Sequence, residues 1–182
     1  MKLVLIAAAA VLAATPALAG GLVAMQRPET GANHRLKVSS PAFNPGAPIP
    51  LKYSAFGENV SPPLNWSLSP AAKSYAILVD DPDGKGTSPV SHWVAWNIPP
   101  SMTMTAEGST AGVQGTNSHG SVGYTGPHPP ASDAAHHYHF QLLALDRMLT
   151  LPAGANREAL LGAVKGHVLA KGELVGTFEA PK

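Results

Sequence analysis

Short apolar runs separated by turn residues set the pattern of this chain. Residues 74–79 form a nearly continuous apolar run, which is typical of a buried central strand. Residues 92–98 and 138–145 are rich in aromatic and aliphatic side chains and are predicted to be strands as well. Weaker patterns predict three further strands, at residues 35–39, 49–55 and 174–178.

One helix is predicted, over residues 157–169. Leu160, Val164 and Val168 recur every four residues and would form an apolar stripe. Asn156 is a suitable N-cap, whereas two glycines inside the segment weaken it. Proline and glycine number 18 each and recur at short intervals, which favours many short strands joined by turns. The pattern therefore predicts a mainly β domain, either a sandwich or an open Greek-key arrangement.

The N-terminus has the pattern of a secretory signal peptide. A lysine at position 2 precedes an apolar run of about 12 residues, shorter than the roughly 20 of a spanning helix. An Ala-x-Ala motif ends at Ala19, so we expect cleavage after Ala19 and a periplasmic or secreted protein. No cysteine follows, which excludes a lipid-anchored cysteine. Residues 20–34 would be a loose lead-in, and residues 35–182 a single domain.

Charge and cysteine content exclude several classes of function. Removing residues 1–19 takes away one lysine, so the formal net charge falls from +1 to 0. Such a balance does not indicate a nucleic-acid partner. The absence of cysteine excludes thiol catalysis, cysteine-based zinc sites and iron–sulfur clusters. Nothing in the pattern indicates an oligomeric state.

Carboxylates follow the most apolar strand directly. Asp80, Asp81 and Asp83 surround Pro82 at the end of the 74–79 run, where side chains can line a pocket. One of these groups could orient an imidazole or bind a hydroxyl or amine of a ligand. Asp-Pro-Asp-Gly is also a good turn sequence, and turn chemistry alone accounts for it.

Histidines gather in two places. His92 opens a strand and could pair with one of the aspartates, or be a buried imidazole satisfied by the backbone. His136, His137 and His139 suggest a metal site, but alternation along a strand puts only His137 and His139 on one face. No metal-specific spacing appears, so we expect no metal and no other cofactor.

A turn at Tyr124, Gly126 and Pro127 could present backbone amides to an anion, or be an ordinary loop. Neither a nucleophile elbow nor a phosphate-binding P-loop is present in the sequence. The segment 118–121, Ser-His-Gly-Ser, has the residue types of a catalytic triad without the context of one.

Six segments carry a resemblance to a known family by their order and their residues. They are Ser61-Pro62-Pro63-Leu64-Asn65-Trp66, Asp81-Pro82-Asp83, His92-Trp93-Val94 with Asn97-Ile98-Pro99, Tyr124-Thr125-Gly126-Pro127 with Pro129-Pro130, His136-His137-Tyr138 with Ala144-Leu145-Asp146, and Gly166-His167-Val168 with Leu174-Val175-Gly176. The chain thereby resembles the phosphatidylethanolamine-binding protein family, also called Raf kinase inhibitor-like proteins, and most of all its bacterial YbhB/YbcL-type branch.

The resemblance implies two antiparallel sheets in a Greek-key, sandwich-like fold with a few peripheral helices. It implies a pocket for phosphate or phospholipid head groups, or inhibition of a kinase or protease partner, rather than catalysis. Carried over by motif, seven residues would bind the ligand: Asp81, Asp83, His92, Gly126, Pro127, His136 and Tyr138.

Two departures from the family pattern stand out. The family commonly continues Asp-Pro-Asp with Ala-Pro, whereas Gly84-Lys85 follows here. It commonly has His-Arg-Tyr, whereas position 137 is a histidine without a permanent charge. The alternative function is a hydrolase that uses an Asp–His pair as its general base, although no clear nucleophile accompanies the pair.

Overall fold

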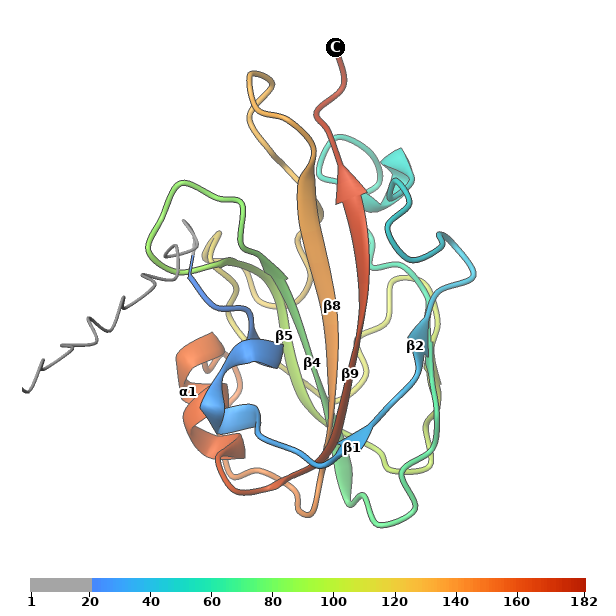
Figure 1. Cartoon of the computed structure of the whole chain (residues 1–182), viewed down its shortest axis with the longest axis vertical. Coiled ribbons are helices and arrows are strands. Elements are labelled where there is room, and N and C mark those ends of the chain that lie inside the picture. The colour runs from blue at the N-terminus through green and yellow to red at the C-terminus, as the bar shows by residue number, and fades with distance from the viewer. Residues whose placement is uncertain (1–20) are drawn as a thin grey trace, which may run out of the picture.

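Two β-sheets form the frame of the protein in its computed structural model, which describes residues 21–182 (Figure 1). The large sheet has six strands in the order β1-β9-β8-β4-β5-β7, and the small sheet has three in the order β2-β3-β6. This confirms the expected mainly β class with two sheets. The expected signal peptide, residues 1–19, lies outside the described residues.

Four long strands make the centre of the large sheet: β4 (Ser74–Asp81), β5 (Val90–Ile98), β8 (His136–Leu145) and β9 (Val168–Phe178). Two short strands, β1 (His34–Arg35) and β7 (Val113–Gln114), lie at its edges. The pairing is antiparallel except between β1 and β9, which run parallel. The small sheet consists of β2 (Val38–Ser39), β3 (Leu64–Trp66) and β6 (Met104–Thr105).

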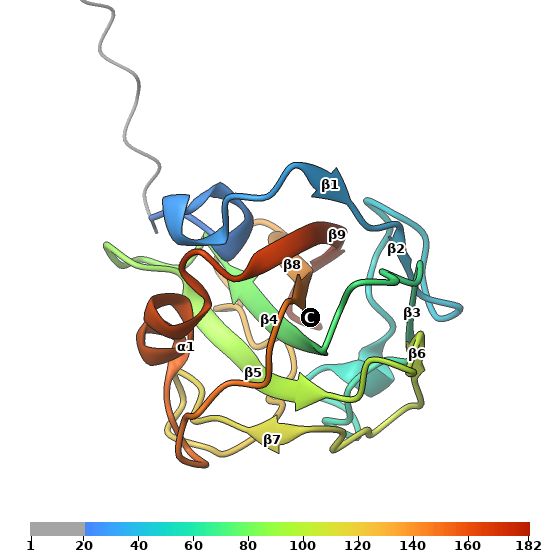
Figure 2. The ribbon, with the colours of Figure 1, turned by 90° about the horizontal axis from the view of Figure 1, so that it is seen from below.

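Both faces of the large sheet are covered, which explains why β4 is buried along its whole length. The front face packs against the small sheet through a cluster that includes Trp66, Trp93, Tyr138 and Phe140. The back face packs against helix α1 (Arg157–Val164) through a second cluster. Figure 2 shows the three layers from one end, with the small sheet and α1 on opposite sides of the large sheet.

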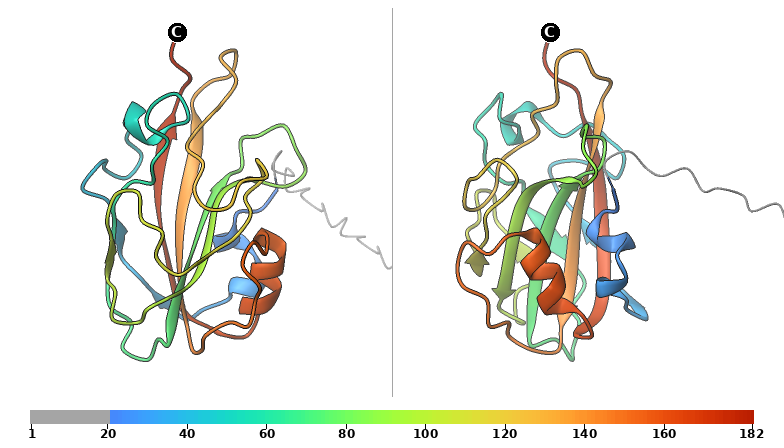
Figure 3. Two further views of the ribbon diagram at one scale, coloured as in Figure 1. Left: turned by 180° about the vertical axis from the view of Figure 1, so that it is seen from behind. Right: turned by 90° about the vertical axis from the view of Figure 1, so that its left-hand side faces the viewer.

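The N-terminal segment is part of this back layer rather than a loose lead-in. Two short 3₁₀ turns, η1 (Ala24–Gln26) and η2 (Pro28–Thr30), lie beside α1 (Figure 3). The side chains of Ala24 and Thr30 are fully buried. The expectation of a loose segment is therefore wrong for residues 22–30, because hydrogen bonds hold this part of the segment to the sheet and to α1.

Asp80 is the centre of that set. The fully buried carboxylate accepts two hydrogen bonds from Arg157, at 3.0 and 3.1 Å, and one from Gln141 at 2.9 Å. It also accepts the backbone N–H of Ala24 at 3.0 Å. Arg157 donates in turn to the carbonyl of Leu22. A buried charge needs such partners, and here they tie the N-terminal segment and α1 to β4.

Two of the predicted strands take a different form. Residues 49–55 hold a 3₁₀ turn, η3 (Leu51–Tyr53), instead of a strand. Ile49 does donate to Thr177 of β9, but the flanking residues Pro48 and Pro50 lack the N–H groups that a continued ladder requires. The predicted strand at 35–39 divides into β1 and β2, which belong to different sheets. The short strands β3, β6 and β7 were not predicted.

The predicted helix is shorter than expected. The Asn156 side chain accepts the N–H of Ala159, which confirms the N-cap, but α1 ends at Val164. Gly166 has a left-handed backbone with φ +79°, and β9 begins two residues later at Val168. The apolar spacing of Val168 therefore belongs to a strand. Within residues 21–182, no helix is long and apolar enough to cross a membrane.

Candidate ligand-binding site

The candidate site begins with a β-bulge that turns His92 toward the front of the large sheet. Val79 pairs with Trp93 and Asp80 pairs with Ser91, so His92 is an extra residue on β5. Bulges bend a strand and redirect a side chain, and they are common beside functional sites. The His92 ring is 2 % exposed and meets the Tyr138 ring edge-on, with 5.1 Å between the ring centroids.

Asp81 and His136 form the next part of the site. The His136 Nδ1–H donates to Asp81 Oδ2 at 2.8 Å, and both side chains are buried. The other oxygen of Asp81 accepts the backbone N–H of Asp83 at 2.8 Å. The two readings of the Asp-Pro-Asp segment are thus compatible, because one oxygen closes the turn and the other holds an imidazole.

Tyr138 brings a hydroxyl into this group without a partner of its own. Its side chain is fully buried, and its oxygen has no hydrogen-bond partner of good geometry among residues 21–182, with Asp81 and the backbone of His128 as its nearest polar neighbours. Burial raises the pKa of Tyr138, and the charge of Asp81 raises it further. The phenol therefore stays protonated and can donate a hydrogen bond. A buried donor left unpaired costs about 1–3 kcal/mol. Tyr138 is one of six residues in the described part of the chain with such a side-chain atom, and it is the one that lies beside His92.

His92 is an acceptor in the same place at neutral pH. Burial lowers the pKa of His92 to about 4, so the ring is neutral. Its Nδ1–H donates to the carbonyl of Thr125 at 2.8 Å, which fixes the tautomer and leaves Nε2 as the nitrogen available to a ligand. The ring is held from the loop side as well, because Asn117 donates to the Thr125 hydroxyl at 2.8 Å.

Gly126 and Pro127 form a wall rather than an anion cradle. The N–H of Gly126 already donates to Asn59 at 2.7 Å, and the carbonyl of Pro127 accepts from Ala55 at 3.0 Å. A Cβ on Gly126 would lie 2.3 Å from the carbonyl oxygen of Tyr53. Glycine is needed here for close backbone packing. The Gly126 amide is thus occupied within the protein, and a ligand-binding role of Gly126 and Pro127 stays a prediction.

Asp83 lies outside the cluster of buried groups. Its carboxylate accepts both the side chain of His137 at 2.8 Å and the backbone N–H of His137 at 2.7 Å. Partial burial would raise the pKa of Asp83, but these hydrogen bonds outweigh it and the pKa is lowered. His137 therefore serves Asp83 at the surface and not the buried groups around Tyr138.

A cleft of about 390 Å³ opens beside the Asp81–His136 pair. Its lining consists of Asp83, Asp133, Ala134, Ala135, His136 and His137. Asp133 lies 3.6 Å from His136 Nε2, and Lys85 reaches Asp133 at 3.1 Å. The Gly84-Lys85 departure thus places a lysine at the rim of this cleft.

Two exposed histidines outside the set carried over by motif lie near the site, His119 against the His92 ring and His128 close to His119. The His119 ring lies 5.0 Å from the His92 ring, centroid to centroid. Partial burial lowers the pKa of His119, and the neighbouring His128 lowers it further. His128 packs on Phe56 with 4.7 Å between ring centroids. The nearness of both residues to the Gly-Pro turn in sequence is the signal that could have found them.

The strand histidines are not arranged as metal ligands. His136 and Tyr138 face inward while His137 is exposed, as alternation predicts. His137 pairs with Asp83, and His139 pairs with Glu173 at 3.0 Å. Among residues 21–182, no group of three or more His, Cys, Asp or Glu side chains is placed to hold a metal ion.

Comparison with known proteins supports the motif resemblance. A sequence profile described as phosphatidylethanolamine-binding protein matches residues 39–179. A UPF0098 protein of Pyrococcus horikoshii is 46 % identical over 155 residues, which cover 79 % of this chain and 76 % of that protein. LppC of Mycobacterium tuberculosis, named as a candidate lipoprotein, is 44 % identical over 146 residues, or 79 % of this chain and 72 % of LppC.

Solved structures agree with these sequence matches. A crystal structure of a phosphatidylethanolamine-binding protein homologue from Chlamydia trachomatis superposes with a TM-score of 0.76 at 40 % identity, covering 82 % of this chain and all of that one. The structure of Escherichia coli YbcL, described as a member of the mammalian family, gives 0.75 at 27 % identity, covering 81 % and 99 %.

Proposed function

The chain belongs to the phosphatidylethanolamine-binding protein family, and we propose that it binds a phosphate-like group between His92, Tyr138 and the Asp81–His136 pair. The observation that carries this proposal is the fully buried Tyr138 hydroxyl, which has no partner among residues 21–182. It lies beside a His92 ring whose Nε2 edge is available. A ligand that accepts from the phenol and donates to the imidazole completes both groups.

The charges restrict the form of the ligand. The Asp81 carboxylate is negative and the neighbouring His92 ring is neutral. A doubly charged phosphate therefore gains little electrostatic attraction from these two residues. A phosphate oxygen that carries a proton can donate to His92 Nε2 while another oxygen accepts from Tyr138. A phosphodiester has no such proton, and its binding must be accompanied by protonation of His92. An ammonium group, as in ethanolamine, is complementary to the Asp81 carboxylate.

Histidine NMR tests this proposal directly. The ring signals of His92, His119 and His136 should move on titration with inorganic phosphate, while those of His139 stay still because Glu173 holds that ring away from the site. O-phosphoethanolamine and vesicles that contain phosphatidylethanolamine form two further arms, which separate a free phosphate ester from a lipid head group. If the His92 and His136 signals do not move at millimolar concentrations of any of these ligands, the proposal fails.

The protein acts outside the cytoplasm in this proposal. Support comes from the N-terminal pattern that ends at Ala19 and from the name of LppC, which describes that relative as a candidate lipoprotein. Expression with the native N-terminus followed by N-terminal sequencing of the exported protein tests the idea. The expected first residue is Gly20, and recovery of the uncleaved chain from the cytoplasm alone would overturn it.

A hydrolase is the second candidate, favoured by the 2.8 Å contact between Asp81 and His136. An aspartate that orients an imidazole is the arrangement of a general base. Turnover of a panel of phosphate esters and carboxylic esters, lost in His136→Ala, would support it. A rate equal to that of the buffer alone for every ester would exclude this use of the pair.

A further inference from the structure

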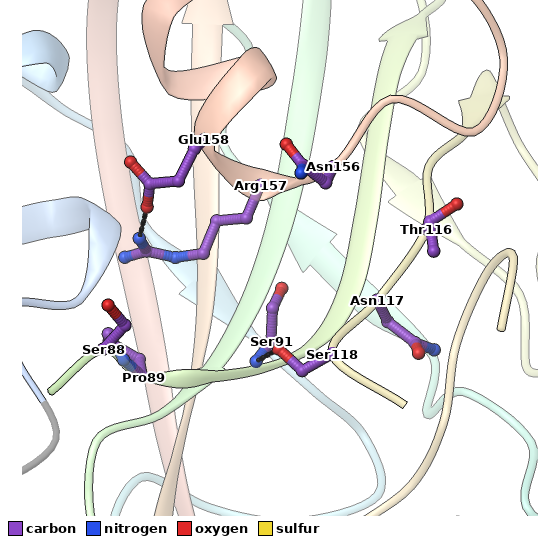
Figure 4. Close-up of a pocket in the computed structure, with 9 residues that line it drawn as sticks. All are labelled: Ser88, Pro89, Ser91, Thr116, Asn117, Ser118, Asn156, Arg157 and Glu158. Atoms are coloured by element: carbon purple, nitrogen blue, oxygen red, sulfur yellow. Dashed lines mark hydrogen bonds and ion pairs between the residues drawn. The ribbon is translucent and has the colours of Figure 1, made fainter. Parts of the chain in front are cut away.

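A second cleft lies on the back of the large sheet, away from the site around Tyr138. Its volume is about 300 Å³, at the lower end of the range of small-molecule pockets. Three parts of the chain meet there: the start of β5, the loop 116–118 and the first residues of α1 (Figure 4). The residues that line this back cleft are Ser88, Pro89, Ser91, Thr116, Asn117, Ser118, Asn156, Arg157 and Glu158.

An orphaned hydroxyl marks this cleft as more than a surface hollow. Ser91 is 2 % exposed, and its Oγ makes no hydrogen bond with residues 21–182. Figure 4 shows the hydroxyl directed away from the strand toward the start of α1. A buried hydroxyl normally finds a partner in the protein, because leaving it unpaired carries the full cost of removing it from water.

The neighbouring polar groups are held in place but keep hydrogen-bonding capacity. Ser118 Oγ accepts the backbone N–H of Ser91 at 2.8 Å, so its own proton can still be donated. The side-chain oxygen of Asn156, Oδ1, accepts the N–H of Ala159 at 3.0 Å. This leaves the two amide protons of the same side chain for another acceptor. Hydrogen-bond donors and acceptors from three different parts of the chain thus line the back cleft.

The charges around the cleft are already balanced. Arg157 is bound by the Asp80 carboxylate at 3.0 and 3.1 Å and by Glu158 at 2.5 Å. Glu158 is also approached by Arg27 at 3.4 Å. Because Arg157 is neutralised and Glu158 faces the cleft, an anion finds no net attraction there. The electrostatics therefore favour an uncharged ligand.

We propose that the back cleft binds a small uncharged compound with several hydroxyl groups, such as a single sugar ring. Each sugar hydroxyl both donates and accepts, which matches the mixture that Ser91, Ser118 and Asn156 present. The Glu158 carboxylate accepts from further hydroxyls, and Pro89 supplies an apolar surface. This site is independent of the phosphate-like ligand proposed above.

Titration of ¹⁵N-labelled protein with D-glucose, N-acetyl-D-glucosamine and glycerol tests the proposal. At least one of them should give saturable shifts of the Ser91, Ser118 and Glu158 amides. Ser91→Ala should lower that affinity by about fivefold or more, the effect of one lost hydrogen bond of about 1 kcal/mol. Ser121→Ala is the matched control, since it removes an exposed hydroxyl from the same loop and should leave the affinity unchanged.

The opposite results would overturn the proposal. One is the absence of saturable shifts at these amides with all three compounds up to roughly 100 millimolar. Another is an equal affinity in Ser91→Ala and the parent protein. A third is saturation of the Glu158 amide by inorganic phosphate in preference to the sugars. His136 on β8 reports on the front site and Glu158 on α1 reports on the back cleft in the same spectra, so the two proposals fail or hold separately.

Discussion

Asp80 and Asp81 are neighbours on β4 whose carboxylates serve opposite faces of the large sheet. Asp80 binds Arg157 on the back, and Asp81 accepts from His136 on the front. Strand alternation produces this division, because successive side chains point to opposite sides. The first carboxylate fastens the helix and the N-terminal segment to the sheet, and the second belongs to the candidate binding site.

Removing the cation from the back pair should destabilise the fold strongly. Arg157→Ala leaves the fully buried Asp80 carboxylate without its main partner, and we expect a loss of about 3–5 kcal/mol in the free energy of unfolding. Urea denaturation followed by circular dichroism measures it. Arg147→Ala is the control, since that side chain is exposed and should change stability by less than about 0.5 kcal/mol. Equal effects of the two variants would contradict the role of the Asp80 network.

Acid should destabilise the protein through His92. Its pKa is about 4 in the folded state and about 6.5 in the unfolded chain, so the unfolded state binds more protons between these values. The neutral His92 ring therefore contributes to the free energy of unfolding fully above pH 6.5. This contribution is lost as the pH falls toward 4, by about 3 kcal/mol at most. His92→Gln, whose amide can still donate to Thr125, should flatten the pH dependence of urea unfolding in this window. An unchanged slope in this variant would show that other groups cause the acid sensitivity.

A methyl group at position 126 should disrupt the wall of the site. In Gly126→Ala the new Cβ would meet the Tyr53 carbonyl at 2.3 Å, so the backbone must shift, at a cost of about 1–3 kcal/mol in unfolding free energy. Gly162→Ala is a matched control inside α1 with open space around the new Cβ, and it should stabilise the protein by about 0.5–1 kcal/mol. Thermal unfolding of the two variants should therefore move in opposite directions.

The exposed histidine over the site should make ligand affinity depend on pH. Burial and His128 lower the pKa of His119, so this ring becomes charged only as the pH falls below its ordinary range near 6.5. Affinity for inorganic phosphate should then rise with falling pH, and His119→Ala should lessen that rise. Calorimetric titrations at pH 7.5 and 5.5 measure both. His34→Ala, at the exposed strand β1, is the control that should leave the pH dependence as it is.

The sequence predicted the central strands and four of the groups in the candidate site, because both depend on local patterns. Continuous apolar runs marked β4, β5 and β8, and ordered motifs marked Asp81, His92, His136 and Tyr138. Short strands such as β7, with two residues, carry too little periodicity to be recognised. Their pairing depends on distant segments that a local pattern does not contain.

The local sequence pattern could not predict which side chains form hydrogen bonds with one another. The sequence left open whether His92 pairs with an aspartate or with the backbone, and the structure gives Asp81 to His136 and His92 to the Thr125 carbonyl. The bulge at His92 and the packing of Gly126 on Tyr53 arise from strand pairing and close tertiary contact. The same limit applies to Asp80, whose partner Arg157 lies 77 residues further along the chain.

Tyr138→Phe separates a binding role of the phenol from a structural one. The Tyr138 oxygen is buried and makes no hydrogen bond with residues 21–182, so its removal costs the fold no hydrogen bond and relieves an unpaired donor. We expect unchanged or slightly higher stability, within about 1 kcal/mol, together with a loss of about fivefold or more in affinity for inorganic phosphate. Urea unfolding and calorimetric titration of one preparation measure the two quantities.

A structural role of the Tyr138 hydroxyl predicts the reverse, lower stability with unchanged affinity, and that outcome would remove the main support for the proposed site. Tyr124→Phe is the matched control for the chemical change: its hydroxyl donates to the Tyr53 carbonyl at 2.7 Å, so that variant should lose stability instead.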